Sequence, residues 1–250
     1  MKKIMTLTAI ILLGGMAAAV KGQDTADLFN KQGLSELNSH DYESAVRHFE
    51  RAIALKPDHV LGRYNLGTAY FYLRRYDAAV AELRKAVELD PTAAAGHNQL
   101  GVVYLESGDS RHAIAEFREA IRLKPDRASS HYNLGCVQIR LGDFKSAIAS
   151  LEQASRLDPG NPEIRLNLAY ALGREKRFGE AIRAMETAID LKPADAELQL
   201  FLGDLFILTK DLARAGEQYA KLQRLDAAIA GKLYSAISGR RVVNVSDWQR

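Results

Sequence analysis

Residues Val60–Pro91 read VLGRYNLGTAYFYLRRYDAAVAELRKAVELDP, and related stretches recur on both sides at a fixed interval of 34 residues. Three series keep that step without insertion or deletion. They are Gly33, Gly67, Gly101, Gly135 and Gly203, with Ala169 in the fifth place; Pro57, Pro91, Pro125, Pro159 and Pro193; and Ala45, Ala79, Ala113, Ala147, Ala181 and Ala215. Self-similarity at a period of roughly 20–50 residues is typical of solenoids and other repeat arrays. The sequence therefore predicts six tandem copies of one structural unit.

Each copy contains two apolar patterns of helical period, separated by a short polar break. In the second copy Leu66 and Tyr70 follow one face of a first helix, and Val80 and Leu83 follow one face of a second. An aspartate that can cap the second helix stands at the same place in four copies, at Asp41, Asp109, Asp143 and Asp211. The proline then ends the second helix, because it cannot donate the next backbone hydrogen bond. We expect hairpins of two helices that approach closely at the small residues, such as Gly67 and Ala79.

The segments NLGTAY (65–70), DAAVAEL (77–83) and KAVELDP (85–91) resemble the tetratricopeptide repeat, and QLGVVY (99–104) and NLGCVQ (133–138) match it comparably. The resemblance covers about residues 26–227 and implies an all-α fold, a right-handed α-solenoid of helix–turn–helix units. The expected repeats are 26–59, 60–93, 94–127, 128–161, 162–195 and 196–228. An amphipathic pattern after the last repeat, with Leu233 and Ile237 on its apolar side, predicts a capping helix over 226–238.

The two ends of the chain lie outside the repeats. Residues 1–19 combine Lys2 and Lys3 with an apolar run and a small-residue site, which is typical of an export signal peptide. A retained N-terminal anchor is the alternative, although the apolar run is shorter than the roughly 20 residues of a spanning helix. Residues 20–25 are expected to be a linker. The tail 239–250 could dock on the array, pair as an edge strand or stay flexible, and we expect it to be flexible.

Composition says little about partners. The formal charge of +3 falls to +1 if Lys2 and Lys3 are removed with the signal. Such a weak charge does not suggest nucleic acid as a ligand. Membrane contact is expected only through the N-terminal segment, if that segment is retained.

The sequence contains no recognisable catalytic motif. Cys136 is the only cysteine, so no internal disulfide can form. It is either a packing residue, which we favour, or a reactive thiol in a groove. No two of the six histidines stand three or four residues apart, as a helical metal pair requires. We therefore expect no enzyme activity, no metal and no cofactor.

A second apolar stripe on the first helices is the candidate binding surface. The first helices carry apolar residues on the side opposite their core-facing residues, and in-register amides lie beside that stripe. Amides can pair with the backbone of an extended peptide, and aromatic rings supply contact area. The resemblance implies that this side is the concave, ligand-binding wall. The expected groove residues are Tyr64, Asn65, Thr68, Phe71, Asn98, Gln99, Val102, Tyr132, Asn133, Cys136, Asn167 and Tyr170.

These observations predict an exported protein that acts as a protein–protein interaction scaffold. It would be periplasmic or secreted, with a membrane anchor as the alternative if residues 1–19 are retained. A peptide or helix of the partner would lie along the groove. Two alternatives remain open: an envelope assembly factor of the pilus or secretion type, and a non-catalytic regulatory subunit of an enzyme complex.

Overall fold

The computed structural model describes residues 25–248, apart from the side chain of Asp247. The export signal expected at 1–19 and the linker up to residue 24 lie outside this range. Contacts divide the chain into two compact units, with the boundary between Lys124 and Pro125. That boundary falls three residues before the end of the expected third copy, after both of its helices, so each unit holds the helices of three copies. Among residues 25–248, no helix has both the length and the apolar composition needed to cross a membrane.

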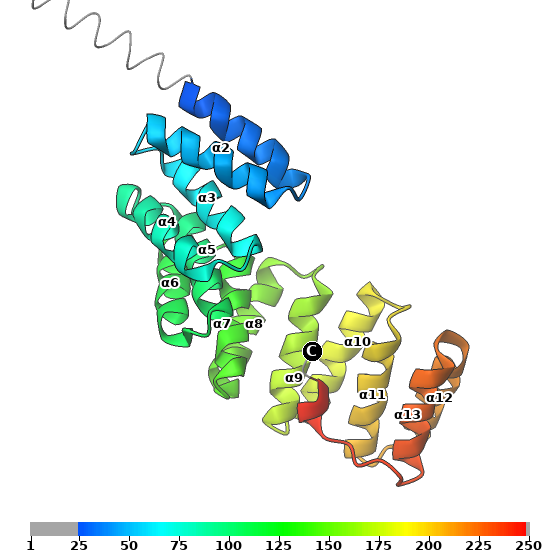
Figure 1. The fold of residues 1–250 in the computed structure, drawn as a ribbon. Helices are drawn as coiled ribbons and strands as arrows, with labels where there is room; N and C mark the ends of the chain where they lie inside the picture. The colour runs from blue at the N-terminus through cyan, green and yellow to red at the C-terminus, as the bar shows by residue number, and fades with distance from the viewer. Residues whose placement is uncertain (1–24, 249–250) are drawn as a thin grey trace, which may run out of the picture. The chain divides into compact units, whose positions relative to one another are not determined.

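The described part of the chain is all-α, with short turns and no strand (Figure 1). The N-terminal unit contains a first helix over 25–38, then α2 (Tyr42–Leu55), α3 (Val60–Tyr72), α4 (Tyr76–Leu89), α5 (Ala94–Glu106) and α6 (Ser110–Leu123). The C-terminal unit contains α7 (Ala128–Arg140), α8 (Phe144–Leu157), α9 (Pro162–Arg174), α10 (Phe178–Leu191), α11 (Ala196–Leu208), α12 (Leu212–Leu225), α13 (Ala227–Ile237) and the 3-10 helix η1 (Val245–Trp248). Within each unit the two helices of a copy pack together, and successive hairpins stack. The predicted class of fold is confirmed.

The predicted caps form at the start of the second helices. Asp41, Asp109, Asp143 and Asp211 each accept a hydrogen bond from a backbone N–H in the first turn of the helix that follows. The backbone N–H of His112 lies 3.1 Å from Asp109 Oδ1, and this bond is the main cause that lowers the pKa of that carboxyl. An ionised carboxylate at this place satisfies a donor that the helix itself cannot pair.

The turn between the two helices has the same backbone conformation in every copy. One residue at its tip has a positive φ, between 57° and 90°: His40, Arg74, Gly108, Gly142, Lys176 and Lys210. Glycine adopts this left-handed region freely, whereas another residue loses about 1–2 kcal/mol. Four copies have a residue other than glycine at this place and still adopt the positive φ. We infer that the packing of the two helices, and not glycine, sets the tight turn.

Small residues make the close approach that the sequence predicts. A Cβ built on Gly101 would lie 2.7 Å from the ring of Phe117, and one on Gly67 would lie 2.6 Å from Leu83. Phe117 and Leu83 are fully buried, so they have no room to move aside. The missing side chain on the first helix is therefore the space that the large residue of the second helix fills.

The capping helix forms where the sequence predicts it. Asp226 accepts from the backbone N–H of Ile229 at the start of α13, and Gly239 follows its end with φ 74°. Leu233 of α13 is fully buried, and a Cβ on Gly203 would lie 2.6 Å from it. In the last copy α13 therefore supplies the large residue that fills the gap left by the glycine.

The tail differs from the expectation of a flexible segment. Val245–Trp248 forms a 3-10 turn, in which Val245 and Trp248 are only 7% and 3% exposed. In a 3-10 helix residues three apart lie above one another, so both apolar side chains face the same way. They join the hydrophobic core of the C-terminal unit. This burial is the physical reason why the segment docks on the unit, whereas the sequence led us to expect a flexible tail.

Candidate functional site

The first helices of the C-terminal unit, α7, α9 and α11, present one surface that we call the first-helix face. A pocket of about 460 Å³ opens on this face. It is lined by Tyr132, Cys136, Ile139 and Arg140 of α7, by Glu163, Leu166, Asn167 and Tyr170 of α9, and by Trp248. Pockets of roughly 300–1,000 Å³ with mixed apolar and polar linings are typical of ligand sites.

Four residues predicted for the groove meet at this pocket: Tyr132, Cys136, Asn167 and Tyr170. Arg140, Glu163 and Trp248 also line it, although the sequence pattern did not predict them. Arg140 ends α7 and Glu163 lies in the first turn of α9, so the helix boundaries together with the repeat register could have indicated them. The position of Trp248 depends on where the tail docks, for which the sequence contains no direct signal.

The amides beside the stripe are engaged within the chain. Asn167 Nδ2 donates to Tyr132 Oη at 3.2 Å and to the carbonyl of Glu163 at 2.9 Å. The equivalent Asn65, 8% exposed, donates to Asn30 at 2.9 Å in the same way. From the sequence we expected these donors to face a ligand. In the structure they link first helices of adjacent copies, and for the buried Asn65 this satisfies an amide that must be paired.

Tyr170 is buried, contrary to its expected place on an open wall. Its side chain is 3% exposed, and its ring lies edge-on to Phe144 at 6.1 Å between centroids. The Arg174 guanidinium donates to Tyr170 Oη at 2.7 Å and also covers the Phe144 ring at 4.3 Å. Tyr170 therefore forms a wall of the pocket mainly as a packing residue, so its removal would damage the fold as well as the site.

The other predicted residues lie on first helices but line no part of this pocket. Tyr64, Thr68, Phe71, Gln99 and Val102 are half-buried in the N-terminal unit and Asn98 is buried there, whereas Asn133 is half-buried on α7. An aromatic cluster that the sequence pattern did not predict surrounds Phe71. Tyr72 is 52% exposed, and its ring stacks on Tyr42 at 4.9 Å and contacts Phe71 at 5.5 Å. Several of the predicted residues thus flank accessible surface in each unit.

The environment of Cys136 favours the packing interpretation. Burial raises the pKa of its thiol from 9.0 to about 11. A pKa that is higher by about two units makes the thiolate fraction near pH 8 about 100-fold lower in the folded chain than in the unfolded chain. The thiolate is the nucleophile that reacts with disulfide reagents. Labelling with a disulfide reagent should be correspondingly slow and should accelerate in denaturant. The folded chain prefers the protonated thiol, so this contribution to stability is complete below pH 9.0 and is lost as the pH rises towards 11. Equal labelling rates in both states would contradict this assignment.

The histidines have partners within their own copies. His97 Nδ1 lies 2.7 Å from Glu116, and His131 Nε2 lies 2.9 Å from the carbonyl of Pro125. Within residues 25–248 no group of three or more His, Cys, Asp or Glu side chains could hold a metal ion.

Comparison with known proteins identifies the family. The model for the tetratricopeptide repeat matches residues 30–94, 98–162, 132–182 and 166–230, which together exceed half of the chain. No curated protein matches the chain by sequence.

Several solved structures share the fold. The structure from a functional characterisation of Pseudomonas aeruginosa pilF is 22% identical, with a TM-score of 0.72, over 86% of this chain and 99% of that chain. The MamA protein is 24% identical, with a TM-score of 0.61, over 70% and 95%. YrrB, described as a TPR protein with an unusual peptide-binding site, is 23% identical, with a TM-score of 0.64, over 75% and 97%. The repeat-model matches and this common fold show that the chain belongs to the tetratricopeptide repeat family.

Proposed function

We propose that this protein binds a segment of a partner protein on its first helices, with the pocket between α7 and α9 as the principal contact. The observation that carries the proposal is the composition of that pocket. Ile139 and Leu166 give the lining an apolar part, and Tyr132, Arg140 and Glu163 add polar and charged residues to it. A peptide offers the matching groups, namely an apolar side chain flanked by backbone donors and acceptors.

We propose a binding role without catalysis, and without metal or cofactor. Cys136 is the obvious nucleophile among the pocket residues, and the burial that raises its pKa leaves it with even less thiolate at neutral pH than an ordinary cysteine has. Nucleic acid is an unsuitable ligand, because the weak net charge of +3 provides little attraction for phosphates. The peptide-binding site described for YrrB supports the proposal by analogy of fold.

The test uses Tyr132, which is half-buried, lines the pocket from α7 and accepts a hydrogen bond from Asn167 of α9. Peptides would be selected from a displayed library on the immobilised full chain, and their dissociation constants measured by fluorescence polarisation. We expect Tyr132→Ala to weaken binding at least about tenfold, because the residue supplies an aromatic contact and holds Asn167. The matched control is Tyr234→Ala on α13, where the side chain is 50% exposed outside the pocket, and binding should be unchanged. Equal affinity of the selected peptides for Tyr132→Ala and the unchanged chain would end the proposal.

We further propose that the protein is exported and that residues 1–19 are removed, leaving it periplasmic or secreted. The support is the basic start, the short apolar run and the small residues of the N-terminus. Mass spectrometry of the chain from a cell-envelope extract should find a mature N-terminus near residue 20. An intact Met1 in a membrane fraction would instead show a retained anchor.

The same fractionation distinguishes the alternative roles. Association with an outer membrane would favour an assembly factor for a pilus or secretion apparatus. Co-purification with one stoichiometric catalytic protein would favour a regulatory subunit. A freely soluble exported pool that binds peptides supports the scaffold.

A further inference from the structure

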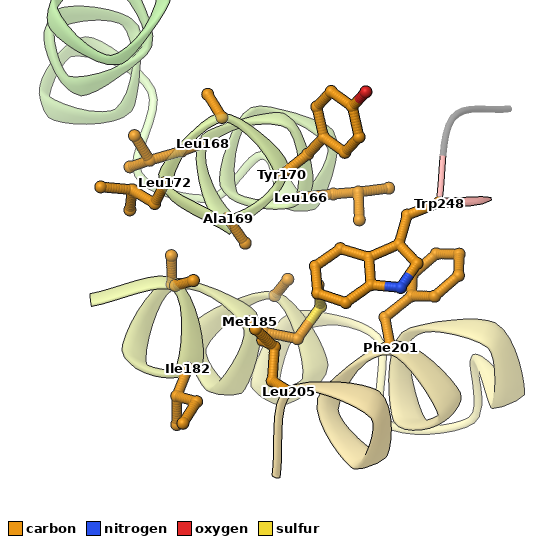
Figure 2. Close-up of a cluster of buried hydrophobic side chains, with 14 of the residues drawn as sticks. Leu166, Leu168, Ala169, Tyr170, Leu172, Ile182, Met185, Phe201, Leu205 and Trp248 are labelled. Atoms are coloured by element: carbon orange, nitrogen blue, oxygen red, sulfur yellow. The ribbon is translucent and has the colours of Figure 1, made fainter. Parts of the chain in front are cut away.

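The segment Val245–Trp248 occupies the first-helix face of its own C-terminal unit. In Figure 1, η1 is the red turn beside α9, and η1 and α9 are in contact. The indole of Trp248 stacks on Phe201 of α11, with 5.4 Å between ring centroids and 28° between planes. Figure 2 shows this indole with Leu166 and Met185 beside it. The segment thus bridges the first helices of copies five and six.

Copy five has a gap that fits this segment. At one place in the first helix the other copies have a large apolar residue, namely Leu37, Phe71, Leu105, Ile139 and Ile207, whereas copy five has Gly173. A Cβ on Gly173 would lie 2.9 Å from Val245 Cγ1 and 3.6 Å from Trp248 Cζ3. The docked segment therefore fills the space that a side chain would otherwise take. A leucine at residue 173 and a docked Val245 exclude each other.

The docked segment is held by few side chains. Val242 is 86% exposed, and Asn244 and Ser246 are also exposed, so Val245 and Trp248 carry most of the apolar contact. The indole Nε1 is buried and has no hydrogen-bond partner. A buried donor without a partner costs free energy, and this cost opposes docking of the segment. Release of the segment would let the indole N–H bond to water. The pocket of about 460 Å³ adjoins Trp248 and extends the occupied surface towards α7.

We propose that Val245–Trp248 is an internal ligand, and that the site around Gly173 takes from a partner protein a short turn with a β-branched aliphatic residue three positions before a tryptophan. This inference rests on the proposed function and specifies its ligand. The partner segment competes with the tail at Gly173 and continues into the pocket at Tyr132. The tail thereby lowers the apparent affinity for every partner that uses the site.

The first experiment tests docking without a partner. Trp248 is the only tryptophan, so its emission reports its own environment. In the full chain we expect emission at short wavelength, and Gly173→Leu should shift it to long wavelength while the helical circular dichroism is retained. Gly160→Leu is the matched control, because nothing lies within 4 Å of a Cβ there, and it should leave the emission unchanged. Emission typical of water-exposed tryptophan in the unchanged chain would overturn the proposal.

The second experiment tests for an external ligand with a labelled peptide of sequence VVNVSDW, which copies residues 242–248. The full chain with Trp248→Ala should bind it at least about tenfold more tightly than the unchanged chain, if the tail occupies the site more than about nine-tenths of the time. Adding Gly173→Leu to that variant should abolish binding. Failure of the peptide to bind the folded Trp248→Ala chain would show that the segment is purely structural.

Two further outcomes identify other causes. If the unchanged chain dimerises and Trp248→Ala does not, the occupant is the tail of a second copy, which would overturn the proposed partner segment. If VVNVSDW binds as expected but the library peptides bind Tyr132→Ala as tightly as the unchanged chain, the internal-ligand site stands and the pocket-based function fails. The two proposals can therefore fail separately.

Discussion

Replacing Gly101 by leucine is expected to lower the free energy of unfolding by about 3 kcal/mol, at the upper end of typical overpacking costs. Even the first carbon of the new side chain would lie 2.7 Å from the Phe117 ring. Phe117 is fully buried, so the ring cannot turn into solvent and the two helices must separate. Urea unfolding followed by circular dichroism measures the change. Gly160→Leu, in open surroundings, is the control and should change stability by no more than about 0.5 kcal/mol.

A double-mutant cycle shows whether the effect arises from this contact. Phe117→Ala alone should cost about 3–5 kcal/mol, because it removes a fully buried ring. Gly101→Leu with Phe117→Ala should cost clearly less than the sum of the single changes, since the leucine can fill part of the vacated space. Strict additivity would mean that Gly101 is needed for another reason.

Replacing Arg241 by alanine is expected to cost about 3 kcal/mol, the lower end of the range for a broken buried ion pair. Arg241 donates to the carboxylate of Asp204 on α11, a side chain that is 2% exposed. It also donates through Nε to the carbonyl of Lys232 at 3.2 Å. Loss of the guanidinium would remove a cation from beside a buried carboxylate. The lower value is appropriate because Arg241 is itself 28% exposed, and water can partly replace it.

The neighbouring Arg240 provides the control, because its side chain is exposed and Arg240→Ala should change stability little. Asp204→Asn in the Arg241→Ala chain should recover part of the loss, since it removes the buried charge that Arg241 no longer faces. Thermal unfolding of the four chains gives the comparison. If Arg240→Ala and Arg241→Ala were equally mild, the ion pair would contribute nothing to holding the segment that follows α13.

Much of the fold could be predicted from the sequence, because the determining interactions are local and repeat. The proline after the second helix of the first five copies, the aspartate caps and the glycine–large pairs all act within one copy. Gly101 and Phe117 are 16 positions apart, a spacing that copies one to four share through Gly33 and Phe49, Gly67 and Leu83, and Gly135 and Leu151. Six repetitions of one pattern make each local inference more certain.

The candidate site was predicted less well, because exposure depends on what neighbouring copies and distant segments cover. Tyr170 belongs to the predicted stripe, yet Phe144 and Arg174 enclose it. Asn65 and Asn167 have the predicted polar character, yet they pair between adjacent first helices. Periodicity identifies the side of a helix on which a residue lies, but not what packs against that side.

The sequence alone determined the hairpin, its register and its number of copies, since those follow from turn chemistry and from the spacing of small and large residues. Only the tertiary structure decided which part of the first-helix face is occupied. Gly173 is visible in the sequence as a break in an apolar series, but the residues that fill it, Val245 and Trp248, follow only after α10, α11, α12 and α13. Contacts at that separation depend on the whole path of the backbone between them, which no local pattern encodes.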